Sequence, residues 1–217
     1  MPTAALLACG LVAPPLFALT FLFEGASRAG YDPWRHAVSQ LSLGEGGWVN
    51  VTALVLCGLM VLAFGFGLGR VYVAGIGSVW APRLLKLFGL SLIAACIFPD
   101  DPSLGYPPGA PEIRTVPGLI HGLAGLILFG SLSAACFVVA RRFAVEPGGN
   151  GWAWYSRLTG LCVPVAFIAC TVLFTLDQAG VLSPALAGLM QRVSLISGLT
   201  WLTLLAARLL SARRVGA

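Results

Sequence analysis

Two histidines and a pair of adjacent aspartates are the residues of this 217-residue chain with the clearest potential for chemistry. His36, His121 and Asp101 form the smallest set that could hold a catalytic Zn²⁺ and leave one position open for water. Alternatively, an aspartic acid kept protonated by an apolar surrounding could donate a proton to an alkene, as a membrane terpene cyclase requires. Any catalytic interpretation therefore depends on His36, His121 and Asp101, with zinc as the candidate cofactor.

A second group of polar residues could bind a ligand without reacting with it. Arg192 lies about one turn inside an apolar segment, where an unpaired guanidinium is costly, so we expect it to pair with Asp101 or, failing that, Asp177. The alternative is that such pairs only fix the ends of helices. The candidate ligand-binding residues are Asp32, Arg35, Ser39, Asp100, Tyr106, Asp177, Gln191 and Arg192.

The composition determines which elements must position these residues. Hydrophobic residues make up 58% of the chain and charged residues 10%, with a mean hydropathy of +0.91, whereas soluble domains carry about 25% charged residues. A helix needs about 20 apolar residues to cross a bilayer. We therefore predict an all-α integral membrane protein, a six-transmembrane-helix bundle forming one polytopic domain over residues 1–217. Its spans are 3–23, 48–69, 84–99, 117–140, 154–176 and 188–210.

The third span is the least certain of the six. Only residues 87–99 lie between Lys86 and Asp100. The segment spans a bilayer only if Arg83 and Lys86 extend their charged ends to the headgroups. A five-span protein remains the alternative.

Charge placement gives an independent prediction of topology. The termini and the second and fourth loops hold nine basic residues and one acid, whereas the other three loops hold four basic residues and seven acids. Basic residues stay on the cytoplasmic side during insertion. We therefore expect both termini to be cytoplasmic, loops 24–47 and 100–116 to face outward, and the protein to be a multi-pass component of a bacterial cytoplasmic (plasma) membrane.

The two long outward loops carry most of the candidate residues. In "DPWRHAVSQLSLG", Asp32 suits a helix N-cap, Pro33 the first helical position and Gly44 the stop. The intervening apolar residues predict a short amphipathic helix in the outer interface, with His36 and Ser39 on its polar side. In "FPDDP", prolines on both sides predict a turn that places Asp100 and Asp101 at the mouth of the bundle. The apolar stripe of the predicted helix is Trp34, Ala37, Val38 and Leu41.

These features favour a function at the outer membrane surface. The basic residues are spread over short loops without a patch of interleaved aromatics, which excludes nucleic acid as a partner. The primary hypothesis is an outward-facing Asp/His/Arg pocket that binds a lipid or other apolar molecule. The alternative is a membrane-embedded enzyme acting on a lipid or isoprenoid, either a metal-dependent hydrolase or a terpene cyclase. Transport ranks last, because no paired broken helices are evident, and the oligomeric state stays open.

Several motifs resemble one known family. "DPWRHAVSQL", "FPDDPSLGYP", the following His121 and "LMQR" are similar to an uncharacterised bacterial membrane family, domain-of-unknown-function family nine-nine-eight. The likeness covers most of the chain and includes the six-span layout. In the family pattern the acid of the F-P-x-D-P turn falls at Asp101, so Asp100 is a departure. The resemblance supplies no reaction, but it implies that a set of residues belongs together, namely Asp32, Arg35, His36, Ser39, Asp101, His121, Gln191 and Arg192.

Overall fold

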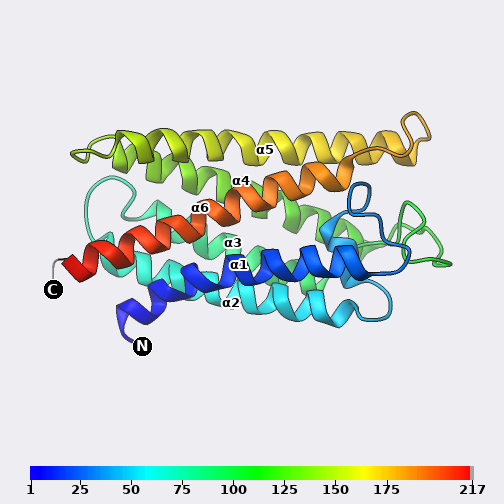
Figure 1. Ribbon diagram of the computed structural model, residues 1–217, viewed down its shortest axis with the longest axis horizontal. Coiled ribbons are helices and arrows are strands. Elements are labelled where there is room, and N and C mark those ends of the chain that lie inside the picture. The colour runs from blue at the N-terminus through cyan, green and yellow to red at the C-terminus, as the bar shows by residue number, and fades with distance from the viewer. Residues whose placement is uncertain (216–217) are drawn as a thin grey trace.

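The described part of the chain folds into six long helices and one short 3-10 helix (Figure 1). The computed structural model describes residues 1–215, and side chains as far as residue 213. All six helices are long and apolar enough to cross a membrane, so the chain is a multi-pass membrane protein. They are α1 (Thr3–Ser27), α2 (Gly47–Val71), α3 (Trp80–Ile97), α4 (Val116–Phe143), α5 (Asn150–Gln178) and α6 (Ala187–Val215), and the 3-10 helix is η1 (Val38–Ser42).

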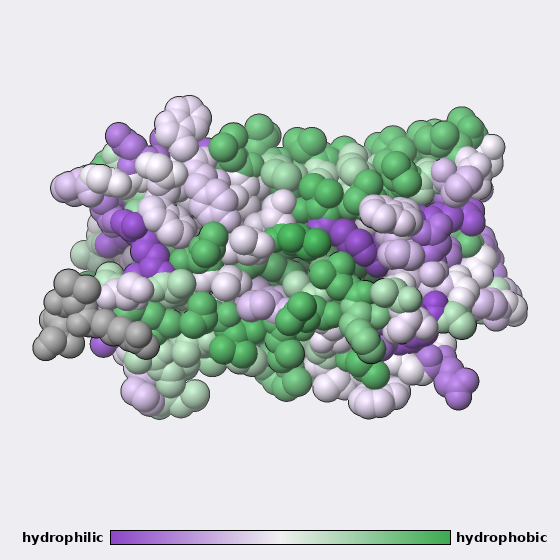
Figure 2. Space-filling view, viewed as in Figure 1, coloured by the Kyte–Doolittle hydropathy of each residue, from purple (hydrophilic) through white to green (hydrophobic). Residues whose placement is uncertain are grey.

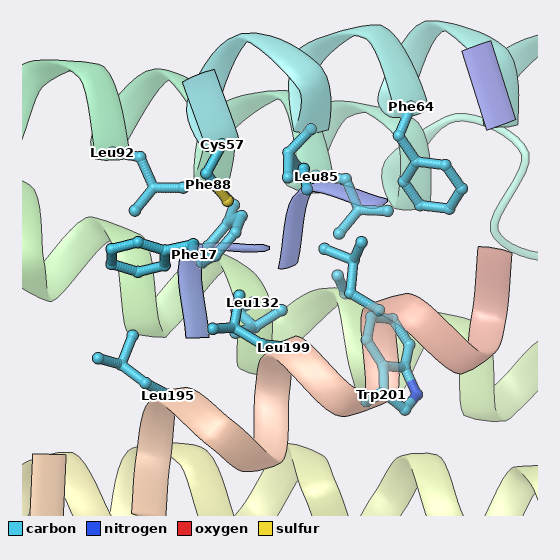
Figure 3. Close-up of a cluster of buried hydrophobic side chains, with 14 of the residues drawn as sticks. Phe17, Cys57, Phe64, Leu85, Phe88, Leu92, Leu132, Leu195, Leu199 and Trp201 are labelled. Atoms are coloured by element: carbon cyan, nitrogen blue, oxygen red, sulfur yellow. The ribbon is translucent and has the colours of Figure 1, made fainter. Parts of the chain in front are cut away.

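The helices form a closed ring. Each packs against its neighbours in the sequence, and α6 packs against α1 to complete the circuit. The interior is filled by large side chains that are almost fully buried, including Phe17, Phe64, Phe88 and Trp201 (Figure 3). Large apolar side chains also cover the outer surface, where Figure 2 shows a hydrophobic belt between two more polar ends. Helices that are apolar on all faces are expected where lipid replaces water around the bundle.

Small residues let two of the helices approach closely. A Cβ at Gly58 of α2 would lie 2.8 Å from the carbonyl oxygen of Gly89 in α3, and a Cβ at Gly89 would lie 2.7 Å from the carbonyl oxygen of Gly58. Backbone contact of this kind supports helix association in lipid, where the hydrophobic effect does not draw helices together. It anchors α3, which at 18 residues is the shortest of the six helices.

The bundle has two different ends. We call the end formed by residues 28–46, 98–115 and 179–186 the loop end. The opposite end carries the start of α1, the end of α6 and the loops 72–79 and 144–149, and we call it the terminal end (Figure 1). All the ligand-binding and catalytic candidates of the sequence analysis lie at the loop end or in the adjoining turns of the helices that reach it.

The amphipathic helix predicted for the first long loop does not form. Residues 33–36 make a turn, and only Val38–Ser42 is helical, as a 3-10 helix. The carbonyl oxygens of Pro33 and His36, which an α-helix would use internally, accept hydrogen bonds from Arg192 instead. The predicted stripe splits accordingly: Ala37, Val38 and Leu41 are buried on the bundle, and Trp34 is exposed.

Candidate functional site

Arg192 holds the first loop against the start of α6. Its Nη1 donates to the carbonyl oxygens of Pro33, His36 and Gly188, and its Nη2 donates to the hydroxyl of Tyr31 at 2.7 Å. Among the residues that the structure describes, the side chain forms no ion pair with a carboxylate, so the predicted ion pair with Asp101 or Asp177 is wrong. Buried backbone oxygens need donors, and here they satisfy the buried guanidinium in place of an acid.

Asp177 pairs with a different arginine. Arg35 Nε and Nη2 each lie 2.8 Å from one oxygen of the Asp177 carboxylate, a bidentate arrangement. The Asp177 side chain is fully buried and also accepts from the backbone N–H of Ala185. The hydrogen bond to Asp177 raises the pKa of Arg35. This pair joins the first loop to the end of α5, two segments far apart in the sequence.

His36 is enclosed rather than displayed on a polar surface. Its Nδ1 accepts from the backbone N–H of Asp32 at 2.9 Å, and its Nε2 lies 3.1 Å from the carbonyl oxygen of Leu104, to which it donates. The rings of Tyr31 and Tyr106 pack against the imidazole and against each other, each with its centroid 5.4 Å from that of the imidazole. Burial lowers the pKa of His36. The imidazole is therefore a neutral packing element with both nitrogens in use.

Asp32 and Tyr106, predicted to bind a ligand, take part in the same packing. Asp32 Oδ1 accepts from the backbone N–H of Trp34 at 2.9 Å, an interaction that closes the turn. Tyr106 is 3% exposed, and its ring meets that of Tyr31 edge to face. Neither side chain is aimed into a cavity that borders the loop end.

Asp101 caps a helix. Its Oδ2 accepts from the backbone N–H of Thr115 at 2.9 Å and its Oδ1 from the Thr115 hydroxyl at 2.6 Å, while that hydroxyl accepts from the N–H of Gly118. The carboxylate lies so close over Gly118 that a Cβ there would overlap it. Asp101 therefore stabilises the positive N-terminal end of α4.

The zinc site considered in the sequence analysis is not assembled. His36, His121 and Asp101 each bond to different parts of the backbone. Among the described side chains, no three histidine, cysteine, aspartate or glutamate residues come close enough to share a metal ion. A hydrolytic metal centre built on these three residues does not fit this geometry.

Asp100, Ser39 and His121 do come together, and we call them the Asp100 cluster. Ser39 Oγ donates to Asp100 Oδ2 at 2.7 Å, and His121 Nε2 lies 4.0 Å from the same oxygen. His121 Nδ1 faces the carbonyl oxygens of Ala95 and Phe98 at 3.0 and 2.9 Å, so Nδ1 carries a proton. His121 Nε2 is thus left facing the carboxylate. The Asp100 side chain is 28% exposed.

Two hollows meet at the Asp100 cluster. A surface groove of about 530 Å³ is lined by Asp100, Asp101 and the adjoining ends of α4 and α5. A small cavity of about 60 Å³ lies inside the bundle among apolar side chains such as Phe17 and Phe129, and Ser39, His121 and Gln191 form its polar wall. Because Asp100 faces the groove and its partner Ser39 faces the cavity, the Asp100 cluster separates the two.

Several buried polar residues were not among the candidates. Gln40 is 0% exposed and bonds to Ala37 and Ser103. Asn50 of α2 is also buried and donates to the carbonyl oxygen of Val38, whose N–H donates to Oε1 of the candidate residue Gln191 at 2.6 Å. For Asn50 the signal in the sequence was a lone amide inside an apolar segment, because polar groups in a membrane need partners.

The family comparison agrees with this arrangement of motifs. The family described as "Protein of unknown function (DUF998)" matches residues 11–208. The chain belongs to the DUF998 family. The resemblance of the sequence motifs to that family is therefore confirmed. No curated protein and no solved structure matches the chain. DUF998 membership names no reaction, so a function must be argued from the loop end itself.

Proposed function

We propose that this DUF998 protein binds an amphiphilic molecule at its loop end, with the polar head at the Asp100 cluster and the apolar tip in the adjoining cavity. The observation that carries the proposal is the position of Asp100 between the groove and the cavity. Pockets of this kind pair apolar walls with a few polar groups that fix orientation. The cavity has room for about two water-sized groups, which is enough for the end of a slender chain.

The chemistry of the groove indicates which heads fit. Asp100, Asp101 and Glu112 line it together with one arginine, Arg114. Ser39 Oγ and the Asp101 N–H already donate to Asp100, so its remaining lone pairs can accept from a ligand. An acid-rich groove attracts cations and repels anions. A hydroxyl or ammonium head is therefore favoured over a carboxylate or phosphate head.

The same geometry favours binding over the catalytic alternatives. Ser39 donates to Asp100 and not to His121, so His121 does not activate it as a nucleophile. A terpene cyclase of the proposed kind would need a carboxylic acid facing the alkene, and no aspartate or glutamate of the described chain lines the apolar cavity. Binding of an apolar molecule needs neither a nucleophile nor an acid.

We also propose that the loop end faces outward, in line with the excess of basic residues at the terminal end. Ile113 at the loop end and Val145 at the terminal end are both exposed, at 56% and 67%. In intact cells, Ile113→Cys should react with an impermeant thiol reagent and Val145→Cys should not, with the unsubstituted chain as background. The reverse pattern would overturn the orientation.

The apolar part of the proposal is tested by filling the cavity. Gly125 of α4 lines it, and a Cβ there would meet no atom within 4 Å. Gly130 on the same helix is equally unobstructed but outside the cavity, so it is a matched control. In phosphatidylcholine nanodiscs, Gly125→Leu should abolish binding of dodecylamine measured by native mass spectrometry, and Gly130→Leu should leave it unchanged. Equal binding of dodecylamine by both variants would show that the ligand does not occupy the cavity.

The proposed binding site of the ligand's polar head is tested with two substitutions that each remove one charge, one in the Asp100 cluster and one elsewhere in the groove. Asp100→Asn should weaken dodecylamine binding about tenfold, because a hydrogen bond to a charged group contributes about 1.5–3 kcal/mol. Glu112→Gln removes the same charge away from the cluster and should change affinity less than about twofold. Dodecanol should bind to the unsubstituted protein and dodecanoate should not. Preferential binding of dodecanoate would exclude the proposed site.

A further inference from the structure

A third hollow, of about 480 Å³, lies at the terminal end, remote from the Asp100 cluster. It is bordered by the ends of α2, α4 and α6. Its wall includes Tyr72, Arg142, Glu146 and Arg208. The predicted function uses none of these residues. Their chemistry differs from that of the loop end, because guanidinium groups dominate here.

Arg208 is a partly buried cation with aromatic neighbours. Its guanidinium carbon lies 4.8 Å from the ring centroid of Phe143 and 5.2 Å from that of Trp152. Within the described part of the chain it makes no hydrogen bond and no ion pair. Stacking on rings orients a guanidinium and leaves its N–H groups free to donate. Arg208 therefore offers donors to a group outside the protein.

Arg142 is fixed on the other side of the same hollow. Its guanidinium carbon lies 3.9 Å from the ring centroid of Tyr72, and its Nη1 donates to the carbonyl oxygens of Ala74 and Ile76. Its Nε lies 3.3 Å from Glu146 Oε1 but makes no hydrogen bond. Glu146 offsets one of the two positive charges, so the hollow keeps a net positive charge.

Tyr72 supplies the observation that indicates a ligand. The side chain is 4% exposed, yet its buried hydroxyl has no hydrogen-bond partner among the described residues. Burial raises the pKa of Tyr72 to about 12, so the hydroxyl keeps its proton at neutral pH and can donate. A buried hydroxyl without a partner carries a penalty of about 1–3 kcal/mol, which an acceptor in the hollow would relieve.

We infer that this hollow binds a phosphoryl anion, held by the guanidinium groups of Arg142 and Arg208 and by the hydroxyl of Tyr72. Arginine forks match phosphate oxygens in geometry as well as charge. The anion is either the headgroup of an anionic lipid or free phosphate. Basic pockets between transmembrane helices near the membrane surface suit lipid headgroups, and the hollow has the volume of an ordinary small-molecule site.

The test measures lipid retention by the full-length protein. The protein in nanodiscs of mixed phosphatidylglycerol and phosphatidylcholine is released into native mass spectrometry, and bound phosphatidylglycerol is counted. Arg208→Gln should lower its affinity about tenfold and Tyr72→Phe about threefold. The control is Arg157→Gln, which removes a terminal-end arginine that stacks on Trp154 outside the hollow and should have no effect.

A second arm separates the two sources of the anion. In pure phosphatidylcholine nanodiscs, inorganic phosphate is added against chloride of matched ionic strength, and thermal unfolding is followed. Stabilisation by phosphate that Tyr72→Phe reduces, without selective lipid retention, would identify free phosphate as the ligand. Selective retention of phosphatidylglycerol would identify the lipid. The inference is wrong if neither probe binds, or if Arg157→Gln reduces binding as much as Arg208→Gln. Tyr72→Phe removes one oxygen only, so it keeps the test valid if Arg208→Gln fails to fold.

Discussion

The two ends of the bundle use several of their arginines in different ways. At the loop end three arginines have polar partners within the protein: Arg35 pairs with Asp177, Arg28 with Glu24, and Arg192 with backbone oxygens, although Arg192 also lies 5.5 Å from the centroid of the Tyr31 ring. At the terminal end four arginines lie over aromatic rings, and Glu146 is the one acid that pairs with any of them among the described residues. The stacked terminal-end pairs are Arg83 on Trp80, Arg142 on Tyr72, Arg157 on Trp154 and Arg208 on Phe143.

This contrast separates two uses of the same side chain. An arginine whose donors are consumed by the protein fixes a loop, as Arg192 fixes the segment that positions Ser39 beside Asp100. An arginine that is oriented mainly by stacking, such as Arg208, keeps its donors free for an external group. The loop end is therefore a preorganised frame around Asp100, and the terminal end presents guanidinium groups that are only partly hydrogen-bonded within the described protein.

The largest expected effect tests this contrast by comparing one ion pair from each end. Arg35→Gln and Asp177→Asn, singly and together, should show a coupling energy of about 2 kcal/mol, because Arg35→Gln leaves the fully buried Asp177 carboxylate without its bidentate partner. The matched pair is Arg142 and Glu146, four residues apart, which make no hydrogen bond to each other and whose carboxylate side chain is 36% exposed, so their coupling should be below about 0.5 kcal/mol. Unfolding in detergent with increasing denaturant measures both. Similar coupling at the two ends would remove the distinction.

Much of the fold follows from local sequence. The six helices follow from apolar runs whose length the bilayer dictates. Two helices start four residues earlier than predicted, α3 at Trp80 rather than at 84 and α5 at Asn150 rather than at 154. In α3, Pro82 suits the first turn of a helix, and Lys86 extends over the ring of Phe66, with Nζ 4.7 Å from its centroid. Arg83 lay just outside the predicted third span, whereas it lies within the helix.

The partners at the loop end do not follow from local sequence. Ser39 and Asp100 are 61 residues apart, and Arg35 and Asp177 are 142 apart. From charge alone we predicted that Arg192 pairs with an acid. A count of acids and bases does not include backbone carbonyl oxygens, and those of an irregular loop are the actual partners of Arg192. The adjacent Asp100 and Asp101 also differ in their roles because their partners lie elsewhere in the sequence. Thr115, unremarkable in the sequence, takes both oxygens of Asp101 and leaves Asp100 to face His121.

The smallest expected effect concerns pH and is confined to the loop end, where both histidines lie. Burial lowers the pKa of His36 below its usual value of about 6.5. Above that value the imidazole is neutral whether the chain is folded or unfolded, so His36 adds no pH dependence. Below it the unfolded chain takes up a proton before the folded one does, and stability falls until the pH reaches the lower folded-state pKa.

Between pH 7.5 and 5.5 the unsubstituted protein should therefore lose up to about 1.4 kcal/mol more stability than His36→Gln, which lacks the titrating group. The slopes of stability against pH are compared between the two proteins. Carboxylates contribute equally to both slopes and cancel, and any destabilisation by the substitution that does not depend on pH leaves the slope unchanged. Hydrogen exchange locates the effect: after correction for the slower intrinsic exchange at low pH, the protection factors of the amides of residues 31–43 should be lower at pH 5.5 than at pH 7.5, whereas those of residues 73–79 at the terminal end should not change. Parallel curves of stability against pH for the two proteins would show that the fold does not hold His36 neutral. That result would contradict the description of His36 as an enclosed, neutral part of the loop end.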